Sequence, residues 1–411
     1  MNLLPLRAAV AVFLAFAFTY FFSALLRAIT ATLSPTLTQE FALHSRDLGL
    51  LAGGYFLGFA ATQLPLGTWL DRHGPKRVIL GFLGIAVVAC VAFSMATSFA
   101  SLLAARVLCG VGVSACLMAP LTGFRRWLDP TTQLRANSWM LMTGSFGMLA
   151  STLPVQWLVP VFGWRPLFWA LAALIAVSML VIALAVPPWQ REPSEGVGSA
   201  PASYAQVWSN PYFRRMAPIG FFSYGGMLAM QTLWAGPWLV RVAGYEPLQA
   251  AGGLFTINSC MLAAFLGWGA LNPQLARHGL TTNRLIACGL PVSLVLLAAI
   301  IVAGPKAGAW AWAAFCVSCT FVSLAQPAVG MAFAPALAGR ALSGYNLVIF
   351  SGVFVVQWGI GLLIDGFGAA GLGTVDAFRA AMTVFLACSA ASYGYFMLAN
   401  RDNRGTATAH P

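Results

Sequence analysis

The sequence predicts an all-α membrane protein with twelve transmembrane helices in two pseudo-symmetric six-helix bundles. Of its 411 residues, 60% are hydrophobic and 8% are charged, whereas soluble domains carry about 25% charged residues. Apolar segments of about 20 residues, the length that crosses a bilayer, recur along the whole chain. Three short motifs also recur in the second half in the same order. These observations exclude a soluble enzyme with a single membrane anchor.

Twelve apolar segments, bounded by charges, Pro/Gly turns and polar clusters, are expected to cross the membrane. No small-residue cleavage site follows residues 8–26, so the first segment is expected to remain as a span. The expected spans are residues 8–33, 48–69, 78–97, 101–122, 136–159, 166–187, 216–239, 248–271, 285–303, 309–332, 342–364 and 378–399.

The two halves of the chain match each other at offsets of 201 to 205 residues. The matching segments are residues 18–20 with 222–224, 70–74 with 275–279, and 155–157 with 356–358. A repeat of six spans keeps its orientation, so the halves should be related by an axis along the membrane normal. We expect an N-terminal bundle (1–187), a cytoplasmic linker (188–211) and a C-terminal bundle (212–411).

The basic residues predict the orientation in the membrane. With the N-terminus inside, fifteen of the 22 Lys and Arg residues fall on the inner side and two lie within spans. Basic residues concentrate in cytoplasmic loops, so both termini are expected in the cytoplasm of a bacterial-type inner membrane. The same rule explains the net charge of +12 without a nucleic-acid partner. The five outer residues are Arg46, Arg165, Arg241, Lys306 and Arg379.

The segment after the second span, residues 67–77, reads Gly-Thr-Trp-Leu-Asp-Arg-His-Gly-Pro-Lys-Arg. This motif loop resembles the signature Gly-x-x-x-Asp-Arg-x-Gly-x-Arg/Lys-Arg/Lys that the major facilitator superfamily carries between spans 2 and 3. The length and the internal repeat also fit, and the resemblance covers essentially the whole chain. It implies a secondary transporter that alternates access to a central cavity.

The resemblance further implies that the motif loop is a conformational latch. Its glycines permit a tight turn, its basic residues suit an anionic inner surface, and its aspartate would meet the start of span 11 near residues 342–344. The alternative is a basic loop that only sets topology. The second-half copy has Ala276 in place of the aspartate, so one latch is expected. The latch residues are Gly67, Asp71, Arg72, Gly74, Lys76 and Arg77.

Two arginines lie within the expected spans, although all ten acidic residues and all four histidines lie in loops or at span ends. An arginine at a helix centre costs roughly 2.5–3.5 kcal/mol on insertion scales, so it should face water, a partner or a substrate. Arg27 lies on a polar stripe of the first span with Tyr20, Ser23 and Thr30. A guanidinium favours a carboxylate, phosphate or sulfate, which predicts an anionic solute. The alternatives are that Arg27 snorkels to the outer surface or bonds backbone carbonyls.

The second arginine, Arg106, forms Arg-x-x-x-Gly with Gly110 and resembles the family's helix-4 motif. The resemblance suggests a coupling role, and a structural role is equally open. Spans 1 and 7 line the cavity in the family, so Tyr224 and Gln231 are expected to contribute with Arg27. Polar residues in spans are more often helix–helix contacts than ligands. The remaining expected substrate contacts are Asn258, Tyr345 and Asn346, with Tyr55, Gln63, Gln326 and Gln357 as further lining candidates.

The sequence thus predicts a secondary transporter for a small, anionic solute, acting as a monomer in the lipid bilayer without a cofactor or bound metal. No Gly-x4-Gly-Lys-Ser/Thr loop is present to bind a nucleotide. Alternatives are a drug or metabolite exporter, which the missing Gly-Pro pair in span 5 disfavours, and a metal (copper-like) or vitamin importer. A copper-like site could use Met227, Met230, Cys260 and Met261, but core packing explains them better. A receptor would need a larger loop, and an intramembrane enzyme would need an acid pair, histidine or Gly-x-Ser-x-Gly elbow within a span.

Overall fold

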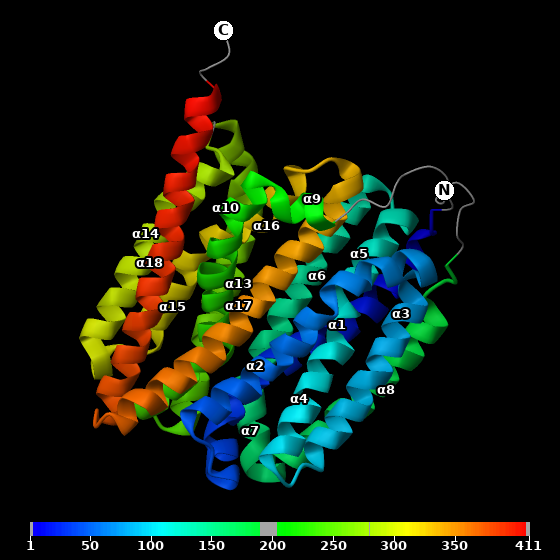
Figure 1. Ribbon diagram of the computed structural model, residues 1–411. Coiled ribbons are helices and arrows are strands. Elements are labelled where there is room, and N and C mark those ends of the chain that lie inside the picture. The colour runs from blue at the N-terminus through cyan, green and yellow to red at the C-terminus, as the bar shows by residue number, and fades with distance from the viewer. Residues whose placement is uncertain (1–2, 190–203, 279, 408–411) are drawn as a thin grey trace. The chain divides into compact units, whose positions relative to one another are not determined.

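The computed structural model describes residues 3–189, 204–278 and 280–407, and almost all of these residues are helical. Figure 1 shows the helices coloured along the chain. The expected linker lies largely outside the described residues. The helices of the first half are α1 (Leu6–Phe41), α2 (Ser45–Ala61), α3 (Gln63–Ser94), α4 (Phe99–Val113), α5 (Ala115–Trp127), α6 (Pro130–Ala150), α7 (Leu153–Phe162) and α8 (Trp164–Ala185). Those of the second half are α9 (Tyr204–Ser209), α10 (Pro211–Ile219), α11 (Gly225–Ala229), α12 (Ala235–Arg241), α13 (Pro247–Arg277), α14 (Thr282–Ala303), α15 (Ala309–Cys319), α16 (Ala325–Met331), α17 (Pro335–Ala369) and α18 (Thr374–Ala407).

Contacts divide the chain into two compact units. Unit 1 comprises Met1–Phe41 and Gly54–Pro201, and unit 2 comprises Ala42–Gly53 and Ala202–Pro411. The change at residues 201–202 falls inside the expected linker 188–211. Helix α2 begins in unit 2 and ends in unit 1, because its first nine residues group with the second half of the chain.

Within the described residues, nine continuous helical segments are long and apolar enough to cross a membrane. The pair α6 and α7, bent by 41°, makes a tenth. The expected span 48–69 is split between α2 and the start of α3. The expected span 216–239 is a series of short helical segments within 211–241. All twelve expected spans therefore correspond to helical segments.

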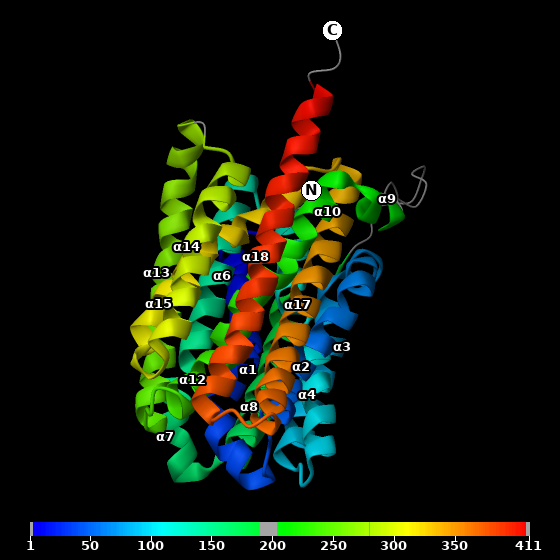
Figure 2. The same ribbon diagram turned by 60° about the vertical axis from the view of Figure 1, so that its left-hand side comes forward.

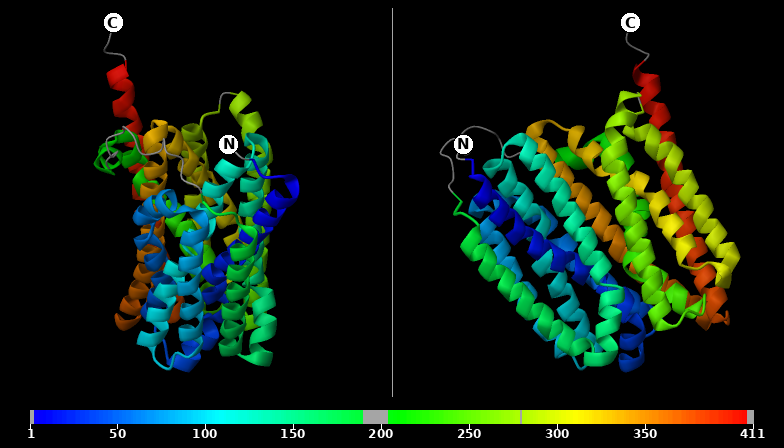
Figure 3. Two further views of the ribbon diagram at one scale, coloured as in Figure 1. Left: turned by 90° about the vertical axis from the view of Figure 1, so that its right-hand side faces the viewer. Right: turned by 180° about the vertical axis from the view of Figure 1, so that it is seen from behind.

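The helices of each unit approach most closely at glycines, and one such contact occurs in both units. In unit 1, α1 packs along α6, which Figure 3 shows from behind as neighbouring blue and teal helices. A Cβ atom on Gly147 of α6 would lie 2.2 Å from the carbonyl oxygen of Phe21. In unit 2, a Cβ atom on Gly352 of α17 would lie 2.3 Å from the carbonyl oxygen of Phe221. This correspondence between the first and fifth spans of each half agrees with the sequence repeat.

The series of helices at 211–241 contains two π-helical segments, η2 (Gly220–Tyr224) and η3 (Met230–Trp234). A π-turn inserts a residue and rotates the side chains that follow it, and such turns are frequent at functional sites. The two expected site residues of this span, Tyr224 and Gln231, both lie in these segments.

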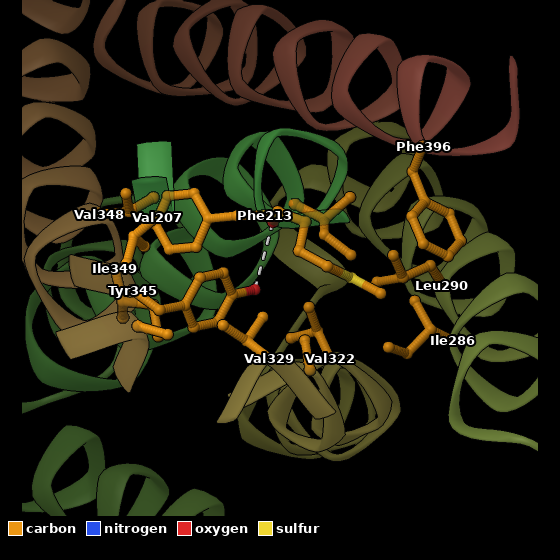
Figure 4. Close-up of a cluster of buried hydrophobic side chains, with 14 residues drawn as sticks. Val207, Phe213, Ile286, Leu290, Val322, Val329, Tyr345, Val348, Ile349 and Phe396 are labelled. Carbon is orange, nitrogen blue, oxygen red and sulfur yellow. Dashed lines mark hydrogen bonds between the residues drawn. The ribbon is translucent and has the colours of Figure 1, made fainter. Parts of the chain in front are cut away.

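Unit 2 has a hydrophobic core where α10, α14, α16, α17 and α18 meet (Figure 4). Phe213, Ile286, Val329 and Phe396 are buried in it. Figure 2 shows α17 and α18, which pack against each other in this unit. This core fixes the start of the seventh span against the helices whose polar residues are described below.

Two of the arginines expected on the outer side cap helix ends instead of lying free in loops. Arg165 at the start of α8 donates a 3.0 Å hydrogen bond to the carbonyl oxygen of Ala96, just beyond α3. Arg379 in α18 donates a 2.8 Å bond to the carbonyl of Ile301 in the last turn of α14. A cation at a helix C-terminus satisfies exposed carbonyls and the helix dipole. Capping thus explains why these two arginines lie at helix ends.

Candidate functional site

Arg27 lies near the middle of α1 and is half-buried. The helix continues to Phe41, well past the expected end at residue 33, because Pro35 is accommodated within it. Arg27 is therefore 14 residues from the end of α1, about 21 Å at 1.5 Å per residue. Its partial burial and the aromatic contacts described below favour a role inside the bundle over attachment to the outer surface.

Aromatic groups of unit 1 surround the Arg27 guanidinium. Its central carbon lies 5.7 Å from the centroid of the Phe59 ring, within cation–π range. Arg27 also interacts electrostatically with Tyr55. The Tyr55 hydroxyl donates to the carbonyl oxygen of Ser23, one turn before Arg27 on α1, at 3.2 Å. These contacts orient the cation.

Arg106 is completely buried and holds the backbone of the Arg27 turn. Its Nη1 donates a 2.8 Å bond to the carbonyl of Leu26, and its Nη2 donates a 3.4 Å bond to the carbonyl of Arg27. Its guanidinium lies 4.8 Å from the centroid of the Tyr55 ring. Of the two roles left open for Arg106, these contacts favour the structural one. Arg106 fixes the part of α1 that carries Arg27.

Gly110, the second residue of the helix-4 motif, lets α4 contact α2 directly. A Cβ atom there would lie 1.8 Å from the carbonyl oxygen of Tyr55. On the facing helix, a Cβ atom on Gly58 would lie 2.1 Å from the carbonyl of Val107. The reciprocal glycines bring Tyr55 close to both arginines.

The other helix-1 candidates are largely used in packing. Tyr20 is buried with its ring against Gly144 of α6, where a Cβ atom would lie 2.6 Å from the ring. Ser23 is buried and its hydroxyl lies 3.4 Å from the carbonyl of Val113. Both residues support the helix that carries Arg27.

The polar candidates of unit 2 form two amide pairs. Gln231 donates from Nε2 to Oδ1 of Asn258 at 2.9 Å, and Gln326 donates to Oδ1 of Asn346 at 2.6 Å. Asn258 also donates to the carbonyl of Leu254 at 2.9 Å, which fixes the orientation of its amide. The structure therefore brings two expected substrate contacts, Gln231 and Asn258, together. It pairs a third, Asn346, with the further lining candidate Gln326.

Gln357 presents a buried acceptor in unit 2. Its Nε2 donates to Thr232 Oγ1 at 3.0 Å, and the Thr232 hydroxyl donates its single proton to the carbonyl of Leu228 at 2.6 Å. Thr232 Oγ1 can therefore only accept a hydrogen bond from Gln357. This requires the amide nitrogen of Gln357, and not its oxygen, to face Thr232. Gln357 Oε1 is buried with no donor among the residues that the structure describes. A buried amide oxygen of this kind favours a hydrogen-bond donor.

Tyr345 was expected to contact substrate, but it lies in the hydrophobic core of unit 2. It is completely buried, and its hydroxyl donates a 3.2 Å bond to the carbonyl of Met216 (Figure 4). Tyr224 is partly buried and packs against the same core. Sequence position alone could not separate a core tyrosine from a lining one, because both interrupt an apolar helix in the same way.

The motif loop is built around Gly74, which has φ 78° and ψ 161°, a conformation nearly restricted to glycine. A Cβ atom there would lie 2.2 Å from Trp189, which follows α8. The guanidinium of Arg126 lies 4.5 Å from the centroid of the Trp189 ring, and the Trp127 ring meets the same indole edge-on at 6.2 Å. Trp189 was not among the residues expected to have a function. Its signal is a lone aromatic residue between a Pro-Pro pair and a polar linker.

The remaining motif-loop residues are more open. Asp71, Arg72 and Arg77 are exposed, whereas Gly67 and Lys76 are half-buried. The expectation that span 11 begins near 342–344 is wrong, because α17 begins at Pro335. Residues 342–344 therefore lie seven to nine residues inside the helix, where backbone N–H groups are bonded within the helix. The helix N-terminus assigned to Asp71 is not at that position.

Within the described part of the chain, no group of three or more His, Cys, Asp or Glu side chains could hold a metal ion. Cys316 and Cys319 are free and buried. Met227, Met230 and Met261 are also buried, while Cys260 is partly exposed.

Comparison with known proteins places this architecture in a family. Residues 16–357 match the sequence profile of the Major Facilitator Superfamily. The chain is 28% identical over 270 residues to the 3-(3-hydroxy-phenyl)propionate transporter of Escherichia coli, covering 64% of each chain. It is 27% identical over 305 residues to the probable sulfoacetate transporter SauU of Cupriavidus necator, covering 68% of this chain and 69% of the relative. It is 26% identical over 214 residues to the multidrug resistance protein MdtL of Shigella flexneri, covering 52% and 54%. The matches thus span between about half and two thirds of these relatives.

Solved structures show the same fold. A bacterial homologue of the human lysosomal transporter Spinster, in an inward-facing and unoccupied conformation, aligns with a TM-score of 0.75, 16% identity, and 97% and 98% coverage. A D-xylose–proton symporter aligns with a TM-score of 0.76, 12% identity, and 94% and 98% coverage. The expected fold class and the resemblance carried by the motif loop are both confirmed. With a family profile matched over most of its length and the fold shared from end to end, this chain belongs to the Major Facilitator Superfamily.

Proposed function

We propose that the protein is a secondary active transporter that moves a small organic or inorganic anion by alternating access. In this proposal, residues 1–187 and 212–411 form the two bundles of a monomer in the inner membrane, and both termini are cytoplasmic. The absence of a nucleotide-binding loop in the sequence supports transport driven by an existing gradient.

The single observation that carries the anion preference is the setting of Arg27. Its guanidinium is half-buried near the middle of α1, and Arg106 fixes the backbone that carries it. The acidic residues of the described helices lie at helix ends or at the kink of α3. A cation kept in such a position is most useful when a carboxylate, sulfonate or phosphate comes to it.

Unit 2, taken by itself, carries hydrogen-bonding groups without charge. Gln231 and Asn258 bind each other, and Gln357 presents an amide oxygen. Neutral amides suit the uncharged polar part of a solute, and Gln357 Oε1 suits a hydroxyl or another donor. Two of the relatives are named for transport of a hydroxylated carboxylate and of a carboxylated sulfonate, and both of these solutes are anions.

Uptake into proteoliposomes tests the proposal. The panel contains 3-(3-hydroxyphenyl)propionate, sulfoacetate, inorganic phosphate and an uncharged analogue of each organic acid. The expected result is uptake of one or more anions but not of the uncharged analogues. Arg27→Ala should reduce this uptake about a hundredfold and Arg27→Lys less, because lysine keeps the charge but loses the bidentate geometry. Arg379→Lys, a substitution at a helix-end cap, controls for arginine replacement as such. Equal uptake of charged and uncharged analogues would contradict the proposal.

A drug exporter is the second candidate, favoured by the relationship to MdtL. Expression in a drug-sensitive bacterial strain distinguishes it. The anion proposal predicts unchanged drug susceptibility, whereas an exporter would raise the inhibitory concentration of lipophilic cations in an Arg27-independent way.

A further inference from the structure

The start of α2 is held by a carboxylate from α17. The backbone N–H groups of Ser45 and Arg46 donate to the two oxygens of Asp365 at 3.1 and 2.8 Å. These are the first two residues of α2, whose N–H groups have no partner inside the helix. Asp365 is 320 residues away in sequence, four residues before the end of α17. An aspartate thus caps a helix N-terminus here, as was expected for Asp71 at a different place.

Glycines bring α2 and α17 into direct backbone contact around this cap. A Cβ atom on Gly361 would lie 2.4 Å from the carbonyl of Ser45, and one on Gly49 would lie 2.4 Å from the carbonyl of Gln357. Gly53 faces Phe354 in the same row. Three successive contacts therefore run along α2 from Ser45 to Gly53. All of them lie within unit 2.

Further polar groups surround the cap. Arg241, at the end of α12, donates to Ser45 Oγ at 3.3 Å and interacts electrostatically with Asp365. Asp47 in the first turn of α2 accepts from the backbone N–H of His44 at 3.0 Å. Just before this turn, Ala42 has a φ of 49°, a left-handed conformation that costs an alanine energy. Such strain persists only where the surroundings hold it.

The division of the chain gives this contact a mechanical consequence. Residues 42–53 belong to unit 2, and α2 continues into unit 1 from Gly54. Gly53 packs on Phe354 of α17, whereas Gly54 packs on Leu103 and Val107 of α4. Adjacent glycines lower helix stability at this junction. A displacement of one unit relative to the other must therefore bend α2 at Gly53–Gly54 or release its first turns from α17.

We propose that Asp365 is a releasable latch that holds the first turns of α2 on α17, and that the transport cycle requires its release. The two charge-assisted hydrogen bonds are short-range and can be broken and remade without unfolding either helix. The row of glycines allows the helices to separate cleanly, since the glycines contribute no side chains of their own at those points. The inference rests on the proposed alternating access, but its test needs no solute and is independent of solute identity.

Accessibility of a buried position on α2 tests the latch. Ala52 is 2% exposed, and Ala52→Cys changes the side chain little. Intact cells are treated with a membrane-impermeant maleimide, and the labelling rate is corrected with the same variant lacking Ala52→Cys, which accounts for the native cysteines. Asp365→Ala should raise the rate about fivefold or more, the change expected when a helix N-cap is lost. Asp376→Ala, which removes a carboxylate bound to Arg379 by an i, i+3 contact, should leave the rate unchanged.

A donor-side variant removes the same contact from the other helix. Ser45→Pro deletes the Ser45 N–H at a position where helices tolerate proline, and should raise labelling as Asp365→Ala does. Ser45→Ala keeps that N–H, loses only the hydroxyl bound by Arg241, and should have little effect. The double variant Asp365→Ala, Ser45→Pro should label no faster than the faster single variant. Size-exclusion chromatography checks that both single variants remain folded. Unchanged labelling rates in both folded variants would overturn the latch. Additive effects in the double variant would also overturn it. Faster labelling of the single variants in inside-out vesicles but not in intact cells would support the latch while contradicting the proposed topology.

Discussion

Replacing Gly74 by alanine should destabilise unit 1 by about 2–5 kcal/mol, and the structure divides this cost into two parts. The first part is conformational: at φ 78° and ψ 161° a side chain costs about 1–3 kcal/mol. The second part is steric, because the new Cβ atom would lie 2.2 Å from the Cβ atom of Trp189. Displacing the indole would lose its stacking on Arg126, about 0.5–2 kcal/mol, and its edge contact with Trp127.

A double-mutant cycle separates the two parts. Thermal unfolding in detergent is measured for the unmodified protein, Gly74→Ala, Trp189→Ala and the double variant. Without the indole, Gly74→Ala should cost only the conformational part, so the two substitutions should be coupled by about 1–2 kcal/mol. Additive effects would refute the packing of Trp189 on the motif loop. An unaltered unfolding temperature in Gly74→Ala would refute the backbone argument as well.

Three further predictions follow from contacts in unit 1. Arg106→Ala should lower the free energy of unfolding by about 1–3 kcal/mol, measured by thermal unfolding. The variant leaves a cavity and loses a hydrogen bond, and removal of a buried charge offsets part of this cost. An unchanged free energy of unfolding would contradict the role of Arg106 in holding α1. Glu40→Gln should lower the free energy of unfolding by about 1–2 kcal/mol in the same assay, because Glu40 binds both Trp164 and Arg165 at partly exposed positions. Glu246→Gln is the control and should leave it unchanged. Hydrogen bonds from Thr131 and Thr132 lower the pKa of Asp129, the N-cap of α6. Its contribution should therefore be complete above the ordinary aspartate pKa near 4 and be lost as the pH falls through the lowered value. Unfolding profiles of Asp129→Asn and the unmodified protein should converge at low pH, and parallel profiles would contradict this.

The spans were predictable because the hydrophobic pattern is a local signal. The ends of the helices were harder to predict, because packing can override a residue that would break a helix locally. Pro35 suggested that the first span ends near residue 33, yet α1 continues to Phe41. Helix α17 begins at Pro335, seven residues before the expected start at residue 342. A mildly polar stretch suggested a loop there, but it forms helix. Both boundaries bear on a functional assignment: the first puts Arg27 nearer the middle of its helix, and the second puts residues 342–344, which were expected to meet Asp71, inside α17 instead of at its start.

The polar residues within the helices were predictable from the sequence, but their contacts were not. Polar interruptions of apolar helices identified Arg27, Gln231 and Asn258, and the structure pairs the last two. The same signal named Tyr345, which lies in the core. Whether such a side chain packs or lines a cavity depends on the face of the helix and on its neighbours, neither of which a single sequence fixes when helices are apolar on all sides.

The contacts that were missed are non-local. Asp365 and Ser45 are 320 residues apart, and Trp189 and Gly74 belong to a linker and a loop that no periodicity connects. A signal for the first existed in the glycine rows of α2 and α17, which indicate close helix approach. An isolated acid near the end of such a row is a natural cap for the helix that approaches it.

Direct binding measurements on purified protein test the central claim, that the Arg27 guanidinium recognises an anionic group. Isothermal titration calorimetry with the anion that is transported best should show binding to the unmodified protein and to Arg379→Lys. Affinity should fall at least about tenfold in Arg27→Lys and be lost in Arg27→Gln, while the unfolding temperature of both variants stays within a few degrees. Undiminished affinity of that anion for a folded Arg27→Gln protein would show that the negative charge is recognised elsewhere.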